Sequence, residues 1–386
     1  MSKKRVGIVT QYYKSLNFGG VLQAYALCET LCKQGYDAEQ ILVQRVNTAT
    51  PRRPAWYEYF NVAKVFRKIN RILQEKKRQS VNTNLKGVEE ARRKAFESFY
   101  ELVPHGEVYL QTELNKSLEK YDVFITGSDQ VWGCGEMDSP YFLGFVPQGK
   151  KKISYAASIG KVAVDERLKE VFESELDKFD AISVREQNAV ALLEPYTKNE
   201  VNWCLDPTLL LSREDWEKIA SQRKIEAKYM LCYFLGDDKA HRKIATQYAK
   251  KHGLKIVTFP HYPVDYHRAD EKFGDIRLTD ASPQDFLSLI KNADIVFTDS
   301  FHASIFSWQF QKEFFTFGRK KHKGMAGRLY SLMDLLGLKE RFIEEVDKNT
   351  LASLEAIELI DYVRPREAYQ EMKKKSFDFL RKNLDA

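Results

Sequence analysis

The sequence predicts an α/β fold organised in two halves. Short apolar runs alternate with stretches of helical spacing along most of the 386 residues. The runs are apolar throughout, which is typical of parallel strands that are buried on both faces of a sheet. Alternation of strands and helices favours parallel strands joined by right-handed crossovers, and the length is sufficient for two domains.

The strand pattern recurs at intervals from one end of the chain to the other. In chain order, the expected strands are 6–10, 39–43, 123–126, 153–157, 181–184, 229–234, 255–259, 295–298 and 314–317. Each is short and is followed by polar or small residues, as buried strands in α/β proteins are.

The chain divides near the step from Asp206 to Pro207. The second half restarts with an expected helix at 213–220, for which Ser212 is a suitable N-cap. We therefore expect α/β domains over residues 1–211 and 212–364, with a basic helical insertion at about 50–118 in the first. A long polar helix over 365–386 is expected to pack back toward the first domain.

The composition is that of an ordinary globular protein, with 44% apolar and 30% charged residues. No apolar run is long enough to span a bilayer, and the run around Val6 is too short for the core of a signal peptide. The five cysteines are odd in number and lack C-x-x-C spacing, which favours reduced thiols over disulfides or a metal site. We therefore expect a cytoplasmic protein without a bound metal.

Positive charge is concentrated in residues 61–98. Eleven lysines and arginines lie there against four acidic residues, and apolar residues recur at helical spacing through the first half of the segment. A basic amphipathic helix either lies on an anionic membrane surface or packs one face on its own domain. Nucleic acid binding is not expected, because no recognition motif accompanies the charge.

Residues 293–310, ADIVFTDSFHASIFSWQF, indicate a ligand site. An apolar strand precedes a helix that is expected to begin at about Phe301, so His302 lies in the first turn. Open α/β sheets bind ligands at the carboxyl ends of their strands, and a helix N-terminus suits an anion, phosphate above all. An imidazole there is an acid, a base or a phosphate ligand. Alternatively, Asp299 or Ser300 only caps the helix and His302 packs nearby.

The loop after the first expected strand contains a pair of glycines. Asn17 and Phe18 precede Gly19 and Gly20, and a helix follows that ends before Gly35. Glycines at a helix entrance let the backbone approach a ligand closely, although they equally well shape a turn. The loop lacks G-x-G-x-x-G, so a dinucleotide-binding function is only weakly indicated. It also lacks G-K-[ST], which argues against a P-loop NTPase.

Small polar residues follow the expected strand at 123–126. Ser128, Asp129 and Gln130 lie at its carboxyl end, with Trp132 close behind. Such residues backed by an aromatic side chain suit a polyhydroxylated ligand. Asp129 would accept hydrogen bonds from sugar hydroxyls or act as a base, or else it caps the next helix.

Arg185 directly follows the expected strand at 181–184. Its guanidinium is a planar, permanently charged donor that matches carboxylate or phosphate. The alternative is an ion pair with Glu186 or another acidic residue.

Taken together, these segments resemble the polysaccharide pyruvyl transferase family. The resemblance covers most of the chain in the expected order and is weakest at residues 50–118 and at the C-terminus. The matching segments are NFGGVLQAYAL, YDVFITGSDQVW, KKISYAASIG, ISVREQNAVALL, CLDPTLLL and DFLSLIKNADIVFTDSFHASIFSWQF.

The resemblance implies two Rossmann-like domains that face a cleft, similar to the glycosyltransferase-B architecture. It also implies transfer of a pyruvyl group from phosphoenolpyruvate onto two hydroxyls of one sugar as a cyclic ketal, with release of phosphate. The acceptor would belong to a cell-surface or capsular polysaccharide or to its lipid-linked precursor. Phosphoenolpyruvate is the donor substrate, and no further cofactor is expected.

The family's histidine in the strand–helix turn falls on His302, and its arginine in the I-S-V-R-E segment falls on Arg185. His302 is the expected general acid or phosphate partner, Arg185 helps to hold the donor, and Asp129 orients or deprotonates the acceptor. The residues expected to contact the substrates are Asn17, Gly19, Gly20, Gln23, Ser128, Gln130, Trp132, Ser300, Phe301 and Arg319.

The chain departs from the family pattern just before the histidine. Some members have an arginine two residues earlier that helps to bind the donor, where this chain has Ser300. Another cation would then help to balance the donor's charge, and the candidates downstream are Arg319, Lys320, Lys321 and Arg328.

Two other functions compete with this one. A nucleotide-sugar-dependent glycosyltransferase of the same architecture would fit the two-domain pattern and Ser300. A non-catalytic protein that binds glycans or a membrane would use the basic residues 61–98. Fold pattern alone does not separate these functions.

Overall fold

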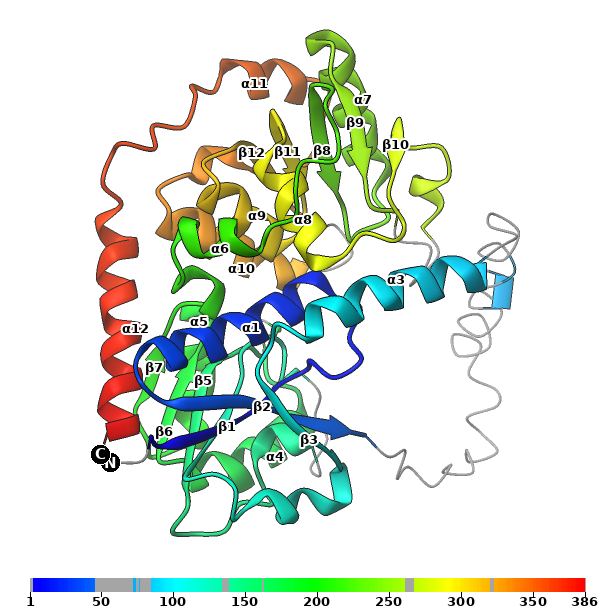
Figure 1. The fold of residues 1–386 in the computed structure, drawn as a ribbon. Coiled ribbons are helices and arrows are strands. Elements are labelled where there is room, and N and C mark those ends of the chain that lie inside the picture. Colours follow the sequence, from blue (N-terminus) through cyan, green and yellow to red (C-terminus); the bar gives the residue numbers. More distant parts are fainter. Residues whose placement is uncertain are drawn as a thin grey trace, which may run out of the picture.

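Two parallel β-sheets with their flanking helices make up the protein (Figure 1). The structure is a computed structural model and describes residues 3–45, 72–73, 76, 85–133, 139–161, 163–260, 267–319 and 323–385. Every described strand pair is parallel, and helices connect most consecutive strands. The expected α/β fold is therefore confirmed.

The first sheet has seven strands in the order β3-β2-β1-β4-β5-β6-β7. Its central strands are buried along nearly their whole length because helices cover both faces. The strand order reverses between β1 and β4, and open sheets bind ligands in the crevice at such a switch point. The strands are β1 Arg5–Val9, β2 Asp37–Gln44, β3 His105–Leu110, β4 Val123–Thr126, β5 Lys151–Ala157, β6 Ala181–Val184 and β7 Val201–Trp203.

Helices α1 and α3 lie on the side of the first sheet that faces the second domain, and α4 lies on the other side (Figure 1). Helix α1 is apolar on most of its surface and buried along most of its length, because it packs between the sheet and the second domain. Its N-cap is Asn17, whose side chain accepts a hydrogen bond from Gly20 N. The helices are α1 Phe18–Lys33, α3 Leu85–Tyr100, α4 Glu166–Glu175 and α5 Gln187–Leu193.

The second sheet has six strands in the order β10-β9-β8-β11-β12-β13, with its switch point between β8 and β11. Capping boxes begin two of its helices, with Ser212 and Asp215 at α6 and Ser282 and Asp285 at α8. The strands are β8 Tyr229–Tyr233, β9 Lys255–Thr258, β10 Ile276–Arg277, β11 Ile295–Thr298, β12 Glu313–Phe317 and β13 Phe342–Ile343. The helices are α6 Arg213–Ile219, α7 Lys239–His252, α8 Pro283–Lys291, α9 Phe301–Gln309, α10 Lys323–Leu335 and α11 Thr350–Ala356.

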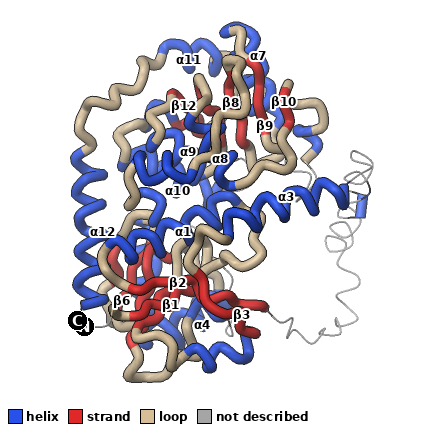
Figure 2. The backbone as a smooth tube through the Cα atoms, viewed as in Figure 1, coloured by secondary structure: helices blue, strands red, loops and turns tan. Residues whose placement is uncertain are grey.

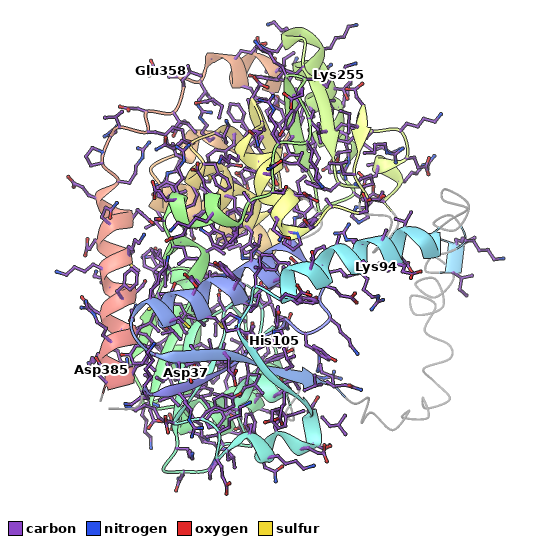
Figure 3. The ribbon with its side chains drawn as sticks, viewed as in Figure 1. Asp37, Lys94, His105, Lys255, Glu358 and Asp385 are labelled. Atoms are coloured by element: carbon purple, nitrogen blue, oxygen red, sulfur yellow. The ribbon has the colours of Figure 1, made fainter. Side chains whose placement is uncertain are left out.

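Helix α12 (Glu367–Asp385) leaves the second domain and runs along the first, so both ends of the chain lie close together (Figure 2). The Ser376 hydroxyl accepts a hydrogen bond from Leu205 N at 2.9 Å. At the far end of the helix, the Tyr36 hydroxyl donates to the carboxylate of Asp385. Figure 3 labels Asp385 at this end and Asp37, the first residue of β2, on the same side of the first domain. These contacts attach the last helix to the first domain.

An aromatic cluster joins the two domains. Phe18, at the start of α1, is completely buried and stacks on Phe286 of α8, with ring centroids 4.6 Å apart and planes 9° from parallel. Tyr233 and Phe259 of the second domain pack edge-on or tilted against the same ring. The cluster fixes the first turn of α1 against the second domain.

All strands expected from apolar runs are present, with ends shifted by at most two residues. The sequence pattern missed four strands, β3, β7, β10 and β13, and these form the edges of the two sheets. An edge strand has one side open, and it therefore lacks the continuous apolar run of an interior strand. In β3, for example, only Tyr109 is fully buried.

Most of the basic segment at 61–98 that precedes α3 lies outside the described residues. Contact of its amphipathic pattern with a membrane therefore stays a prediction. Within the described part of the chain, no helix has both the length and the apolar character that crossing a membrane requires.

Replacing Phe18 with alanine should lower the free energy of unfolding by about 3–5 kcal/mol, because the substitution leaves a cavity where the domains meet. Urea denaturation measures this change. Leu359→Ala is the control, since Leu359 is 80% exposed and its loss should change stability by less than about 0.5 kcal/mol. Equal stabilities for the two variants would show that the aromatic cluster does not hold the domains together.

Candidate active site

The turn between β11 and α9 places His302 at the boundary between the domains. Ser300 is the N-cap of α9, and its hydroxyl accepts a hydrogen bond from Ala303 N at 3.4 Å. The Asp299 carboxylate accepts from Leu235 N at 2.6 Å and from Gly236 N at 2.9 Å, which anchors the turn to the segment after the neighbouring strand β8. The helix is therefore capped as expected, and His302 also reaches across to the first domain.

A buried carboxylate, Asp206, lies between His302 and Arg185. Its Oδ2 atom is 2.9 Å from Nη1 of Arg185 and 3.4 Å from Nε2 of His302. Its Oδ1 atom accepts hydrogen bonds from the backbone N and the hydroxyl of Thr208 at 3.0 and 2.7 Å. Asp206 is 1% exposed. It thus joins a side chain of the first domain to one of the second.

Burial alone would raise the pKa of Asp206, but the nearby His302 and Arg185 and the hydrogen bond from Thr208 hold that pKa well below its usual range. Asp206 is therefore ionised at any ordinary pH. Asp206 is not among the residues expected from the sequence to form the site, although it lies in the CLDPTLLL segment. Its position soon after β7 could have indicated a site residue, but β7 is an edge strand without an apolar run and is not recognisable in the sequence.

Arg185 is buried beside a set of carboxylates. Its Nε atom donates to Glu186 at 3.2 Å, and Nη1 lies 3.5 Å from Asp129 as well as bonding to Asp206. Burial alone would lower the pKa of Arg185, but these carboxylates raise it, so the guanidinium stays charged. The ion pair with Glu186 is present, and yet Nη2 is buried without a hydrogen bond to any described residue. Arg185 thus retains a donor for a ligand.

The glycine pair at the start of α1 touches the same site. A Cβ atom on Gly19 would lie 2.0 Å from Nδ1 of His302, so only glycine fits there. A Cβ atom on Gly20 would meet its nearest neighbour, Asp129, at an ordinary 3.5 Å. The first turns of α1 and α9 therefore approach each other closely, so the partial positive charge of both N-termini lies near His302.

The loop after β4 is built by buried hydrogen bonds. Gln23 donates to the Thr10 hydroxyl at 3.1 Å and accepts from Ser128 N at 3.1 Å. Asp129 follows with a left-handed φ of 63°, and its side chain is 14% exposed. Gln23 and Ser128 are expected from the sequence to contact the substrates, but both side chains are completely buried. They position Asp129 instead.

Trp132 is also placed differently from the expectation. Its side chain is completely buried, donates from Nε1 to Tyr141 O at 3.1 Å and stacks on Phe142. It therefore supports the loop from within the core and does not contact a ligand. The Gln130 side chain lies against Gly160, while its backbone O accepts a hydrogen bond from Gln11.

The basic residues after β12 differ in the contacts that their side chains make. Arg319 donates from Nε and Nη2 to the backbone O of Asp299, so it braces the turn that holds His302. Lys320 and Lys321 lie outside the described residues. Arg328 of α10 lies beside Phe301, whose ring also packs against Arg185.

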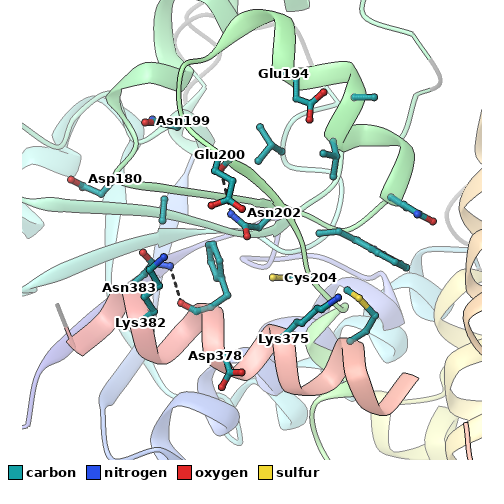
Figure 4. Close-up of a pocket in the computed structure, with 18 residues that line it drawn as sticks. Asp180, Glu194, Asn199, Glu200, Asn202, Cys204, Lys375, Asp378, Lys382 and Asn383 are labelled. Atoms are coloured by element: carbon teal, nitrogen blue, oxygen red, sulfur yellow. Dashed lines mark hydrogen bonds between the residues drawn. The ribbon is translucent and has the colours of Figure 1, made fainter. Parts of the chain in front are cut away.

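A cleft of ≈ 440 Å³ opens next to Asp129, at the carboxyl ends of β1 and β2. Polar and aromatic side chains line it, among them Gln11, Tyr13, Asn17 and Gln44. Another groove, of ≈ 910 Å³, lies between α5, β7 and α12, and none of the candidate site residues lines it (Figure 4). In the described part of the chain, no group of histidines, cysteines and carboxylates is arranged to hold a metal ion.

The fold is similar to that of several solved structures. UDP-N-acetylglucosamine 2-epimerase from Rickettsia bellii superposes with a TM-score of 0.56 at 12% identity, and the match covers 100% of this chain and 98% of that one. UDP-GlcNAc 2-epimerase from Methanocaldococcus jannaschii superposes with a TM-score of 0.54 at 11% identity, and that match covers 98% of this chain and 99% of the other. Likeness at this identity shows the fold alone, which is the expected glycosyltransferase-B type with two parallel-sheet domains.

No curated protein matches the chain significantly. A family model described as polysaccharide pyruvyl transferase matches residues 17–321, a span that includes the glycine pair, Arg185, Asp206 and His302. The match covers well over half of the 386 residues. The chain therefore belongs to the polysaccharide pyruvyl transferase family.

Proposed function

We propose that this protein transfers a pyruvyl group from phosphoenolpyruvate onto two hydroxyls of one sugar, in a polysaccharide or its lipid-linked precursor, and releases phosphate. The observation that carries the proposal is the buried cluster of Arg185, Asp206 and His302. It brings an anion-binding side chain of one domain beside a proton-carrying side chain of the other. Membership of the family supports the same reaction.

The donor would be held through its negative charges. Phosphoenolpyruvate has a carboxylate and a phosphate on one carbon, and Arg185 has a buried Nη2 donor that makes no hydrogen bond with a described residue. The N-termini of α1 and α9 add partial positive charge where Gly19 meets His302. Removal of water from such a site strengthens each of these interactions.

His302 is suited to be the general acid. Its Nδ1 edge packs against Gly19, while Nε2 lies 3.4 Å from Asp206 Oδ2 and makes no hydrogen bond with a described residue. His302 would give a proton to the methylene carbon of the donor, which becomes a methyl group, while a sugar hydroxyl oxygen bonds to the adjacent carbon. A positioned acid of this kind typically contributes about 10²–10⁴-fold to the rate.

Closure of the ketal needs a second hydroxyl of the same sugar. The bond from carbon to the phosphate oxygen breaks, phosphate leaves with the electron pair, and the second oxygen bonds to the same carbon. Asp129, partly exposed at the edge of the cleft, would accept the proton of the first hydroxyl and release it to the departing phosphate, and the proton of the second hydroxyl restores His302. The cleft of ≈ 440 Å³ beside Asp129 is the proposed place of the sugar.

The direct test is incubation with phosphoenolpyruvate and a panel of free and lipid-linked glycans. We expect phosphate release that depends on the acceptor, with a matching gain of mass on the sugar. Parallel calorimetry with nucleotide-sugars tests the competing glycosyltransferase. Tight binding of a nucleotide-sugar, with no binding of phosphoenolpyruvate, would overturn the proposal.

Gly19→Ala and Gly20→Ala form a matched pair. The methyl group added at position 19 would displace the His302 ring, and we expect kcat/KM to fall by about 10²-fold or more. The second variant adds the same methyl group at an ordinary contact distance from Asp129 and should lose much less activity than the first. Steady-state kinetics measures both, and equal activities would contradict the assignment of His302.

Asp206→Asn tests the buried carboxylate. Because the pKa of Asp206 is lowered on folding, its pairing stabilises the protein fully above the unfolded value of about 3.9 and is lost as pH falls through the folded value. The variant should therefore be less stable than wild type at pH 7, and the difference should shrink toward pH 3. Urea denaturation across this range measures it.

The same variant should also lose most of its kcat, because His302 loses its charged partner. If the stability difference is independent of pH, or if kcat is unchanged, Asp206 does not have the assigned role.

A further inference from the structure

Arg328, on α10, makes no ion pair with a described carboxylate, although Glu186 and Asp129 are near enough to act on its charge. Its Nε atom is buried and makes no hydrogen bond with a described residue, and no described carboxylate lies within ion-pair distance of it. The guanidinium carbon lies 5.9 Å from the centroid of the Phe301 ring, and that of Arg185 lies 4.6 Å from the same centroid. Two guanidinium groups thus share one aromatic side chain, next to His302.

This arrangement is unfavourable in the unliganded protein. Burial, together with the neighbouring positive charges of Arg185 and Arg319, lowers the pKa of Arg328 to about 10. Two other arginines of the same domain are buried and paired, Arg242 with Asp270 at 2.8 Å and Arg341 with Glu313 at 2.5 Å. Arg328 has no such carboxylate among the described residues, and an incoming anion would supply the missing charge.

We propose that Arg328 is a ligand for the anionic donor and supplies the positive charge that Ser300 does not. This inference rests on the proposed function. Arg319 is the alternative within the described chain, but two of its nitrogen atoms already donate to Asp299 O. Phe301 directly precedes His302, so an anion held between Arg185 and Arg328 would lie at the N-terminus of α9.

The space between the two arginines is small before the donor binds. A cavity of ≈ 20 Å³ is lined by Arg185, Asp206, Phe301 and Arg328, which is room for one water and not for a phosphate. The flexible stem of Arg328 therefore has to swing toward the donor as it binds. In the unliganded protein the Arg328 guanidinium is repelled by Arg185 and Arg319, and in the complex it would be attracted by the bound anion.

The test compares Arg328→Met with Arg341→Met. For Arg328→Met we expect the KM for phosphoenolpyruvate to rise about 10- to 100-fold with a smaller change in kcat. The melting temperature of the unliganded variant should stay equal or rise, because the variant removes a partly buried charge that has no ion pair with a described carboxylate. Arg341→Met should show the reverse, with a lower melting temperature and an unchanged KM, because it leaves Glu313 unpaired.

Arg328→Lys, which keeps the charge, should recover part of the affinity. Unchanged binding of phosphoenolpyruvate by Arg328→Met in calorimetry would overturn the inference and leave the proposed function intact. If the wild type itself does not bind phosphoenolpyruvate, the proposed function fails, and inorganic phosphate becomes the probe. Phosphate binding that is lost in Arg328→Met would still support the anion site, and no phosphate binding by wild type would overturn it.

Discussion

The buried negative charge of Asp206 constrains the rest of the site. A carboxylate removed from water is costly unless charges and hydrogen bonds surround it, and Asp206 has Arg185, His302 and Thr208 around it. Arg185 directly follows a strand of the first sheet, and His302 lies in helix α9, which follows a strand of the second. The interaction therefore requires the two domains to stay together, and it couples the domain arrangement to the positions of the side chains that would perform the reaction.

Close packing between the domains makes this interaction possible. Helix α1 approaches α9 until Gly19 lies against the His302 ring, and the Phe18 ring inserts among aromatic side chains of the second domain. A residue with a Cβ atom at position 19, or a smaller residue than phenylalanine at position 18, would change the separation. The same few residues of α1 thus contribute both to stability and to the shape of the site.

Much of the fold could be predicted from the sequence, because interior strands of a parallel sheet are continuously apolar. The edge strands could not, since one side of each is open and polar residues are allowed there. His302 and Arg185 could be located because each lies just after an interior strand. Asp206 follows the edge strand β7, which had no recognisable pattern, and its role depends on partners that are distant in sequence.

Other parts of the candidate site depend on tertiary packing in the same way. Trp132 follows the polar residues after β4 and is expected from the sequence to contact a sugar, but it fills the core of its own domain. The sequence offered several cations downstream of His302 with nothing to separate them. Only the folded chain distinguishes Arg319, which is bonded to Asp299 O, from Arg328, whose Nε atom makes no hydrogen bond with a described residue.

A crystal structure with phosphoenolpyruvate or a non-reactive analogue tests the central claim most directly. We expect the donor's anionic groups to contact Arg185 and Arg328 at the N-terminus of α9, with its methylene carbon within reach of the His302 imidazole. Asp206 should remain in contact with both Arg185 and His302. A donor bound elsewhere, such as in the groove between α5 and α12, or a donor that leaves His302 out of reach of the methylene carbon, would contradict the account.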